Sequence, residues 1–193
     1  GGGLQCVDTA VVERCFIRGN TAQGIGGGVC CDGGVSVSDC MIASNSATLL
    51  GGGFVIQTGV VSVVQRCIVQ ANTTDGVGGG GYVRVNGVVL DSLVTANYAG
   101  DATVTNAGGL FLRRGGGATN CTVAGNTAAG GSGGVYLDDS EGTQPRLTAC
   151  IVYSNEPSNY AWTQQIGHFI EYSCLSPESS LFNGTGNITD EPL

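Results

Sequence analysis

One six-residue pattern recurs six times along the chain, and its spacing limits the possible folds more than any other feature. Each copy begins with a cysteine or a serine and ends with an asparagine, and an aliphatic residue stands three positions before that asparagine. The copies begin at Cys15, Cys40, Cys67, Ser92, Cys121 and Cys150, and they end at Asn20, Asn45, Asn72, Asn97, Asn126 and Asn155. The asparagines follow one another at intervals of 25, 27, 25, 29 and 29 residues. Because repeats of about 20–50 residues are typical of solenoids, we expect a stacked repeat architecture.

Glycine supplies a second marker that keeps the same phase. The chain has 35 glycines, and many of them lie in clusters. The clusters are Gly1–Gly3, Gly26–Gly28, Gly51–Gly53, Gly78–Gly81, Gly108–Gly109 and Gly133–Gly134. No Gly-X-Y period occurs, which excludes collagen, and a hydrophobic content of 41% is too high for a disordered chain. The glycines therefore punctuate an ordered structure.

The segments between the markers are short and rich in β-branched residues, as in Val35–Ser38 and Val60–Val64. Such runs, bounded by Gly and Asn, predict β-strands. A unit of about 25 residues fits one coil of two or three short strands, stacked on the next coil at about 4.8 Å. We therefore predict an all-β fold, a parallel β-helix (solenoid) of six to seven coils with 25–29 residues per coil. Residues 1–155 are expected to form the coils, and residues 156–193 the final coil and a C-terminal extension.

Stacking places equivalent residues of successive coils above one another, which explains the choice of residue at each marker. An asparagine column at Asn20, Asn45, Asn72, Asn97, Asn126 and Asn155 predicts amide hydrogen bonds from coil to coil. Asn also tolerates the left-handed backbone of a tight turn. The glycine clusters predict corners where φ is positive or where a β-carbon would clash.

Nine cysteines would suggest disulfides in an extracellular protein. However, side chains stacked in one column have parallel Cα–Cβ bonds, which give poor disulfide geometry. We therefore predict a column of buried free thiols at Cys15, Cys40, Cys67, Cys121 and Cys150. Cys6 and Cys31 share an offset after their glycine clusters and predict a second inward column. Cys30 and Cys174 are expected to be exposed or paired elsewhere.

The charge of the chain excludes two classes of partner. Its net charge is −8 and it contains no lysine, so it lacks the clustered cations that bind nucleic acid or anionic membranes. Such an acidic surface suits a soluble protein outside the cell. The one histidine is His168, and no Cys-x-x-Cys pair occurs. We therefore expect no metal and no other cofactor.

At these markers the chain resembles the right-handed parallel β-helix repeats of bacterial surface proteins, and most of all the chlamydial polymorphic outer-membrane protein pattern. In that family a Gly-Gly-apolar motif alternates with Phe-x-x-Asn. The first motif stands here as Gly-Gly-Gly-Val29 and Gly-Gly-Gly-Phe54. The second stands as Ile17-Arg-Gly-Asn20 and Val123-Ala-Gly-Asn126, with an aliphatic residue in place of Phe. The resemblance implies a right-handed coil and a place outside the cell or on its surface. The closing stretch, Glu171–Pro177 and Gly186–Leu193, is similar to the endings of β-helix regions in large secreted bacterial proteins and implies a parent chain that continues beyond Leu193.

Two charged pairs are candidates for a binding or catalytic site. Arg113-Arg114 and Asp138-Asp139 follow their glycine clusters at matching offsets, so the arginines are expected to lie over the aspartates on adjacent coils. One interpretation is a carbohydrate site, since polysaccharide lyases and glycoside hydrolases with a β-helix fold use such residues. The other is a cross-strand ion pair worth about 0.2–1 kcal/mol, which we favour because fold alone does not confer function.

Two smaller features concern the surface. Three Asn-x-Thr sequons, at Asn72, Asn183 and Asn187, are candidate glycan acceptors, whereas the sequon at Asn120 adjoins the cysteine column. Aromatic residues gather between Tyr153 and Tyr172, and we expect them to cover the last coil in preference to binding sugars or proteins.

These features favour a structural or adhesive role over catalysis. The first hypothesis is an extracellular or cell-surface solenoid that acts as a rigid spacer, a filament subunit or a binding wall. Its expected partners are copies of itself stacked head to tail or the rest of a longer chain, with glycans as a further candidate. The alternative is a polysaccharide-binding or polysaccharide-degrading module. A third, weaker hypothesis is a segment of a phage or viral fibre.

Overall fold

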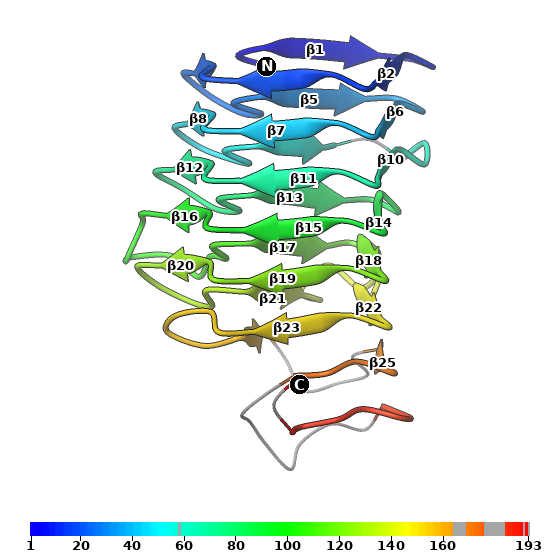
Figure 1. Cartoon of the computed structure of the whole chain (residues 1–193), viewed down its shortest axis with the longest axis vertical. Helices are drawn as coiled ribbons and strands as arrows, with labels where there is room; N and C mark the ends of the chain where they lie inside the picture. The colour runs from blue at the N-terminus through cyan, green and yellow to red at the C-terminus, as the bar shows by residue number, and fades with distance from the viewer. Residues whose placement is uncertain (58, 164–168, 176–183, 191, 193) are drawn as a thin grey trace.

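The computed structural model describes residues 1–57, 59–163, 169–175, 184–190 and 192. Its strands pair only in parallel, and successive coils stack into a β-solenoid of about six turns (Figure 1). No helix occurs among the described residues, and thus none there is long and apolar enough to cross a membrane. The predicted all-β parallel solenoid is confirmed.

Each full coil contributes one strand to each of four sheets, which we name A to D in the order in which the chain enters them. Sheet A consists of β1 (Leu4–Val7), β5 (Val29–Asp32), β9 (Phe54–Ile56), β13 (Gly81–Arg84), β17 (Leu110–Arg113), β21 (Val135–Asp138) and β24 (Tyr160–Trp162). Sheet B consists of β2 (Val11–Glu13), β6 (Ser36–Ser38), β10 (Val63–Gln65), β14 (Val88–Leu90), β18 (Gly117–Thr119), β22 (Arg146–Thr148) and β25 (Phe169–Glu171). The coil thus holds four strands where two or three were predicted.

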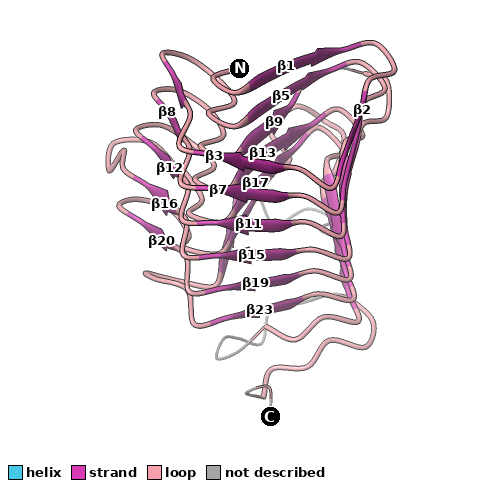
Figure 2. Cartoon of the chain, turned by 45° about the horizontal axis from the view of Figure 1, so that its top comes forward, coloured by secondary structure: helices cyan, strands magenta, loops and turns pink. Residues whose placement is uncertain are grey.

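The other two sheets complete the coil. Sheet C consists of β3 (Phe16–Arg18), β7 (Met41–Ala43), β11 (Ile68–Gln70), β15 (Leu93–Thr95), β19 (Thr122–Ala124) and β23 (Ile151–Tyr153). Sheet D consists of the two-residue strands β4 (Thr21–Ala22), β8 (Ser46–Ala47), β12 (Thr73–Thr74), β16 (Tyr98–Ala99) and β20 (Thr127–Ala128). Figure 2 shows sheets A, B and C around the core, with the short strands of sheet D at the left.

The core follows from the two-residue alternation of a strand, which sends every second side chain inward. In sheet C the middle residue of each strand points into the core, as in Ile42, Val69 and Val94, and all three are fully buried. Inward columns of sheets A and B, such as Val83 and Val89, belong to the same cluster. Because the register is constant from coil to coil, one coil's apolar residue packs on its equivalent above and below.

The bends on both sides of sheet C each use a residue with positive φ. Arg66 (φ 49°) separates β10 from β11, and Ala71 (φ 53°) separates β11 from β12. In each coil the column residue stands directly after its bend. In this coil the cysteine is Cys67 and the asparagine is Asn72. The expectation that the asparagine itself takes the left-handed conformation is therefore wrong, because the residue before it does.

The glycine clusters lie where sheet D leads into sheet A. A β-carbon built on Gly79 would come within 2.5 Å of the carbonyl oxygens of Gly108 and Tyr98. Gly78, next to it, has a φ of +76°. Close approach of neighbouring coils and positive φ both therefore require glycine at this corner.

Candidate functional site

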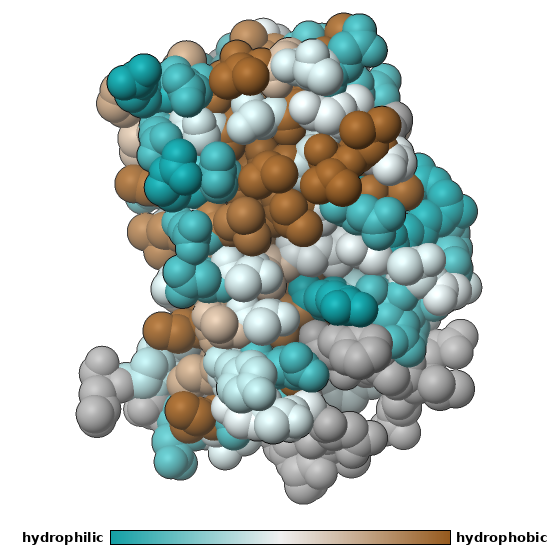
Figure 3. Space-filling model, turned by 90° about the vertical axis from the view of Figure 1, so that its right-hand side faces the viewer, coloured by the Kyte–Doolittle hydropathy of each residue, from teal (hydrophilic) through white to brown (hydrophobic). Residues whose placement is uncertain are grey.

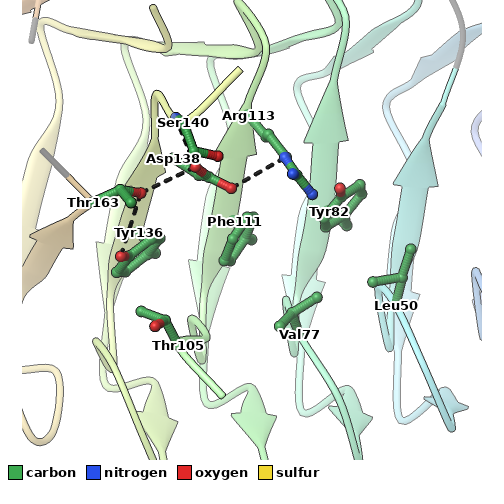
Figure 4. A pocket seen from close by; sticks show the side chains of 10 residues that line it. All are labelled: Leu50, Val77, Tyr82, Thr105, Phe111, Arg113, Tyr136, Asp138, Ser140 and Thr163. Carbon is green, nitrogen blue, oxygen red and sulfur yellow. Dashed lines mark hydrogen bonds and ion pairs between the residues drawn. The ribbon is translucent and has the colours of Figure 1, made fainter. Parts of the chain in front are cut away.

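The outer face of sheet A carries a file of aromatic rings. Tyr82, Phe111 and Tyr136 occupy equivalent outward positions on β13, β17 and β21. Their ring centroids lie 5.5 Å and 5.1 Å apart, with interplanar angles of 16° and 19°. The rings thus stack face to face along the solenoid axis, so that their edges, not their faces, are turned outward (Figure 4).

A second column packs beside the rings and forms one wall of a groove. It comes from the turn before each glycine cluster, where Leu50 bridges Val77 in parallel, and both residues pack against the aromatic cluster. The groove between this wall and the outward side chains of Arg113 and Asp138 has a volume of about 300 Å³. Such a volume is at the small end of ligand sites, which run from about 300 to 1,000 Å³.

The opposite wall of the groove is polar and contains the predicted pair Arg113 and Asp138. These residues are directly opposite each other in the register of β17 and β21, and Arg113 Nε lies 3.0 Å from Asp138 Oδ2. Both residues line the groove, together with Ser140 and Thr163. Figure 4 shows their side chains on one side of the rings and Leu50 and Val77 on the other.

The other two candidates do not line the groove. Arg114 and Asp139 lie just beyond the ends of β17 and β21. Glu141 forms ion pairs with both Arg113 and Arg114, and sequence reasoning missed it. The only sequence signal for Glu141 was the length of its coil. The interval between Asn126 and Asn155 has 29 residues, four more than the shortest intervals, and Glu141 lies within it.

Asp138 is held in its ionised form. Its burial would raise its pKa, but hydrogen bonds from Ser140 and Thr163 and the charge of Arg113 outweigh that effect and lower the pKa. Oδ1 accepts from the Ser140 amide and from Thr163 Oγ1, each at 3.0 Å. A carboxylate so stabilised is a hydrogen-bond acceptor and a poor general acid.

The groove does not contain the usual groups of a polysaccharide-degrading enzyme. Glycoside hydrolases use two carboxyl groups on either side of the scissile bond, and Asp138 is the one carboxylate among the described lining residues. No group of three or more His, Cys, Asp or Glu side chains that could hold a metal occurs in the described part of the chain.

The asparagine column forms a hydrogen-bonded ladder along the axis. Asn72 Nδ2 donates to Asn97 Oδ1 at 3.0 Å, and the same amide nitrogen donates to Ile42 O at 2.9 Å. Equivalent amide-to-amide bonds join Asn20 to Asn45, Asn45 to Asn72, Asn97 to Asn126 and Asn126 to Asn155. Asn155 passes the ladder on to Asn159, which sequence reasoning missed because it stands only four residues later.

The cysteine column is held by backbone groups. Cys67 Sγ donates to Gln65 O, and Cys67 N donates to Ser92 Oγ at 3.1 Å. Ser92 Oγ donates in turn to Leu90 O, so a hydroxyl fills the place of the thiol. Ser173 continues the column by accepting from Cys150 N at 3.1 Å.

Two predictions about the cysteines are wrong. Cys15 is exposed, although its column was expected to be buried. Cys30, expected to be exposed or paired elsewhere, is a buried free thiol. It points outward from β5, but the turn at Gly26 covers it. All nine cysteines are free, and Cys6 and Cys31 are adjacent in the register of β1 and β5.

The remaining surface predictions have mixed outcomes. Asn72 is fully buried and its amide is bonded, so in the folded chain it is not an accessible glycan acceptor. Asn120 is exposed and donates to Asp91 Oδ1. Asn183 and His168 lie outside the described residues. Tyr160 and Trp162 stack on each other at 5.6 Å in β24.

An apolar patch lies over the upper strands of sheet B (Figure 3). Val11 in β2, and Val60 and Val61 just before β10, have 66%, 61% and 54% of their surface accessible. This patch carries no charged or hydrogen-bonding arrangement comparable to that of the groove.

Comparison of the chain with protein-family models, with curated proteins and with solved structures gives no match.

Proposed function

We propose that this chain is a structural solenoid of an extracellular or cell-surface protein, where it serves as a rigid spacer or binding wall. The buried asparagine ladder carries this proposal. Each amide in the middle of the ladder bonds to the coils on both sides, as Asn97 does to Val69 and Asn126. Since these bonds are shielded from water, bending the solenoid would break several of them at once.

The place of such a solenoid is argued from sequence chemistry. The acidic, lysine-free composition suits a place outside the cell. The alternating Gly-Gly-apolar and aliphatic-x-x-Asn motifs resemble the polymorphic outer-membrane type of surface repeat. Because the coils stack in register, we expect the partner of this solenoid to be another coil of the same kind. That coil would come either from a longer chain or from a second copy stacked head to tail.

Hydrogen exchange tests the rigidity of the coil stack. We expect the backbone amides of the ladder, Asn45, Asn72, Asn97 and Asn126, to exchange only by global unfolding, because each donates to a buried side-chain oxygen. Exchange of these amides within minutes under native conditions would contradict a rigid spacer. Electron microscopy beside solution mass separates the two partners: filaments mean stacked copies, and discrete particles mean a module of a longer chain.

A turnover assay tests the structural role against an enzymatic one. The chain is incubated with neutral and acidic polysaccharides, and reducing ends and unsaturated uronates are measured. We expect no release above the buffer control. Release that disappears in Asp138→Asn would overturn the structural proposal.

A second candidate function is a polysaccharide-binding module. The groove on sheet A favours it, because an ion pair, several hydroxyl side chains and an apolar wall meet in one hollow. This function needs no turnover and is compatible with a rigid binding wall.

A further inference from the structure

The two largest insertions into the regular coil both lie at the groove. Six residues connect sheet D to sheet A after β12 (75–80) and after β20 (129–134), but ten connect β16 to β17 (100–109). Likewise, three residues connect β13 to β14 (85–87) and β17 to β18 (114–116), but seven connect β21 to β22 (139–145). The first long connection supplies Thr105 to the groove, and the second supplies Ser140. The solenoid is complete without these extra residues, so they point to a function at this place.

The second long connection is fixed against the sheet. Glu141 pairs with Arg113 and Arg114, and the Gly115 amide donates to Thr143 O at 2.9 Å. The groove wall is thus pre-organised, which lowers the entropy lost when a ligand binds.

The groove is amphiphilic across its width. Leu50 and Val77 form the apolar wall, the ring edges form the floor, and Arg113, Asp138 and Thr163 form the polar wall (Figure 4). A hydrogen-bonded chain runs from Tyr136 Oη to Thr163 Oγ1 and on to Asp138 Oδ1. A fitting ligand has one apolar side and several hydroxyl groups on the other, as a sugar ring does.

The charged residues of the polar wall and those directly beside it form one ion-paired group of balanced charge. Two arginines, Arg113 and Arg114, are ion-paired with two carboxylates, Asp138 and Glu141. A ligand carboxylate would have to displace one of these partners, and it would approach a chain with a net charge of −8. A ligand hydroxyl can instead donate to a carboxylate and accept from an arginine without separating them.

From this arrangement we propose that the groove is a binding site for a neutral saccharide, held by Arg113, Asp138 and Thr163. The proposal rests on the second candidate function and names the ligand class and the residues. Because the rings turn their edges outward, the sugar lies along the apolar wall and does not stack on a ring face.

The test titrates the whole chain with three tetrasaccharide probes: a neutral gluco-oligosaccharide, a neutral manno-oligosaccharide and an oligogalacturonate. We expect at least one neutral probe to bind at millimolar concentration or below, and the galacturonate about tenfold more weakly. Binding of the neutral probe should not change with salt, since no net charge is neutralised. Stronger binding of the galacturonate would overturn the proposal.

Three variants locate the site. Thr163→Val removes one hydroxyl with little change of shape, and Asp138→Asn removes the charge. Each should weaken the neutral probe about tenfold. Thr122→Val, on the outer face of sheet C, is the matched control and should bind as the unmodified chain does. If Asp138→Asn fails to fold, as judged by its melting curve, Thr163→Val decides.

The other outcomes count against the proposal in distinguishable ways. Neutral binding that Thr163→Val leaves unchanged would overturn the groove as the site but keep the polysaccharide-binding function. Binding of none of the three probes would overturn both. The proposal of a rigid structural solenoid is tested separately, by hydrogen exchange of the ladder amides.

Discussion

Asn72 and Asn97 share a hydrogen bond between two fully shielded amides: Asn72 Nδ2 donates to Asn97 Oδ1 at 3.0 Å, and the two residues are 0% and 1% exposed. Asn97 Oδ1 also accepts from the backbone amide of Asn72, and its Nδ2 donates to Val69 O and Asn126 Oδ1. One side chain therefore satisfies four buried polar groups.

Asn97→Ala should consequently be costly. It removes four hydrogen bonds and leaves the Asn72 backbone amide without its acceptor, whereas Asn72 Nδ2 and Asn126 Oδ1 keep their bonds to Ile42 O and to the Asn97 amide. A buried unsatisfied group costs about 1–3 kcal/mol, and the three other lost bonds add to that cost. We expect the free energy of unfolding to fall by about 3 kcal/mol or more, measured from urea denaturation. Asn20→Ala is the matched control, because the Asn20 side chain donates only one bond of the ladder, to Asn45, and should cost about 1 kcal/mol. Equal losses in the two variants would mean that the ladder contributes little.

Gly79→Ala tests the close approach of neighbouring coils. Its β-carbon would lie 2.5 Å from the carbonyl oxygens of Gly108 and Tyr98, and these backbone atoms cannot move without disturbing two sheets. We expect a loss of about 3 kcal/mol or more in the free energy of unfolding. At Gly24 a β-carbon meets nothing within 4 Å, so Gly24→Ala should be neutral or stabilise by up to about 1 kcal/mol. A Gly79→Ala protein as stable as Gly24→Ala would refute the steric explanation.

The buried thiol of Cys67 predicts a loss of stability in alkali. Burial raises the pKa of Cys67 from 9.0 to about 11. Above pH 9 the unfolded chain releases this proton while the folded chain keeps it, so the free energy of unfolding falls between about pH 9 and 11. The slope for one such thiol is at most about 1.4 kcal/mol per pH unit.

Cys67→Ser isolates this contribution, since Ser92 shows that a hydroxyl fits the same column. The variant's stability, measured by urea denaturation at several pH values, should fall less steeply over that window. Identical pH profiles would show that the pKa of Cys67 is the same in the folded and the unfolded chain.

Thiol labelling under native conditions should separate the nine cysteines into three groups. Cys15 is exposed and should react quickly, whereas Cys174 is half-buried, donates to Asp190 O and should react more slowly. The other seven are buried and should react only after unfolding. Mass spectrometry of peptides reads the label, and unfolding without reductant should expose nine thiols. A smaller number would reveal disulfides.

How far the sequence determines this structure depends on whether the relevant contacts recur. Asn72 and Asn97 are neighbours because the same residue returns at a constant phase, and in-register stacking turns sequence period into contact. The solenoid and its inward columns could be predicted on this ground. The burial of Cys30 could not, because strand alternation points it outward, where the glycine turns at Gly26 and Gly1 lie against it.

The groove was less accessible to such reasoning. The pairing of Arg113 with Asp138 follows from matching offsets, but Thr163 stands after β24, beyond the last copy of the cysteine-to-asparagine pattern. Glu141 lies in a connection found in one coil alone. A repeat period predicts only the contacts that recur in every coil. The groove is built partly from residues outside the repeat, so its geometry could not be predicted from the sequence.

The long connections at 100–109 and 139–145 have a practical consequence. Each adds four residues to its coil, yet the strands before and after keep their register with the neighbouring coils. The coil therefore accommodates extra residues at these two corners without a change in strand register. A foreign peptide spliced into either corner should be displayed on the side of an unchanged rod, which makes this solenoid a ready scaffold for presenting loops at a fixed height.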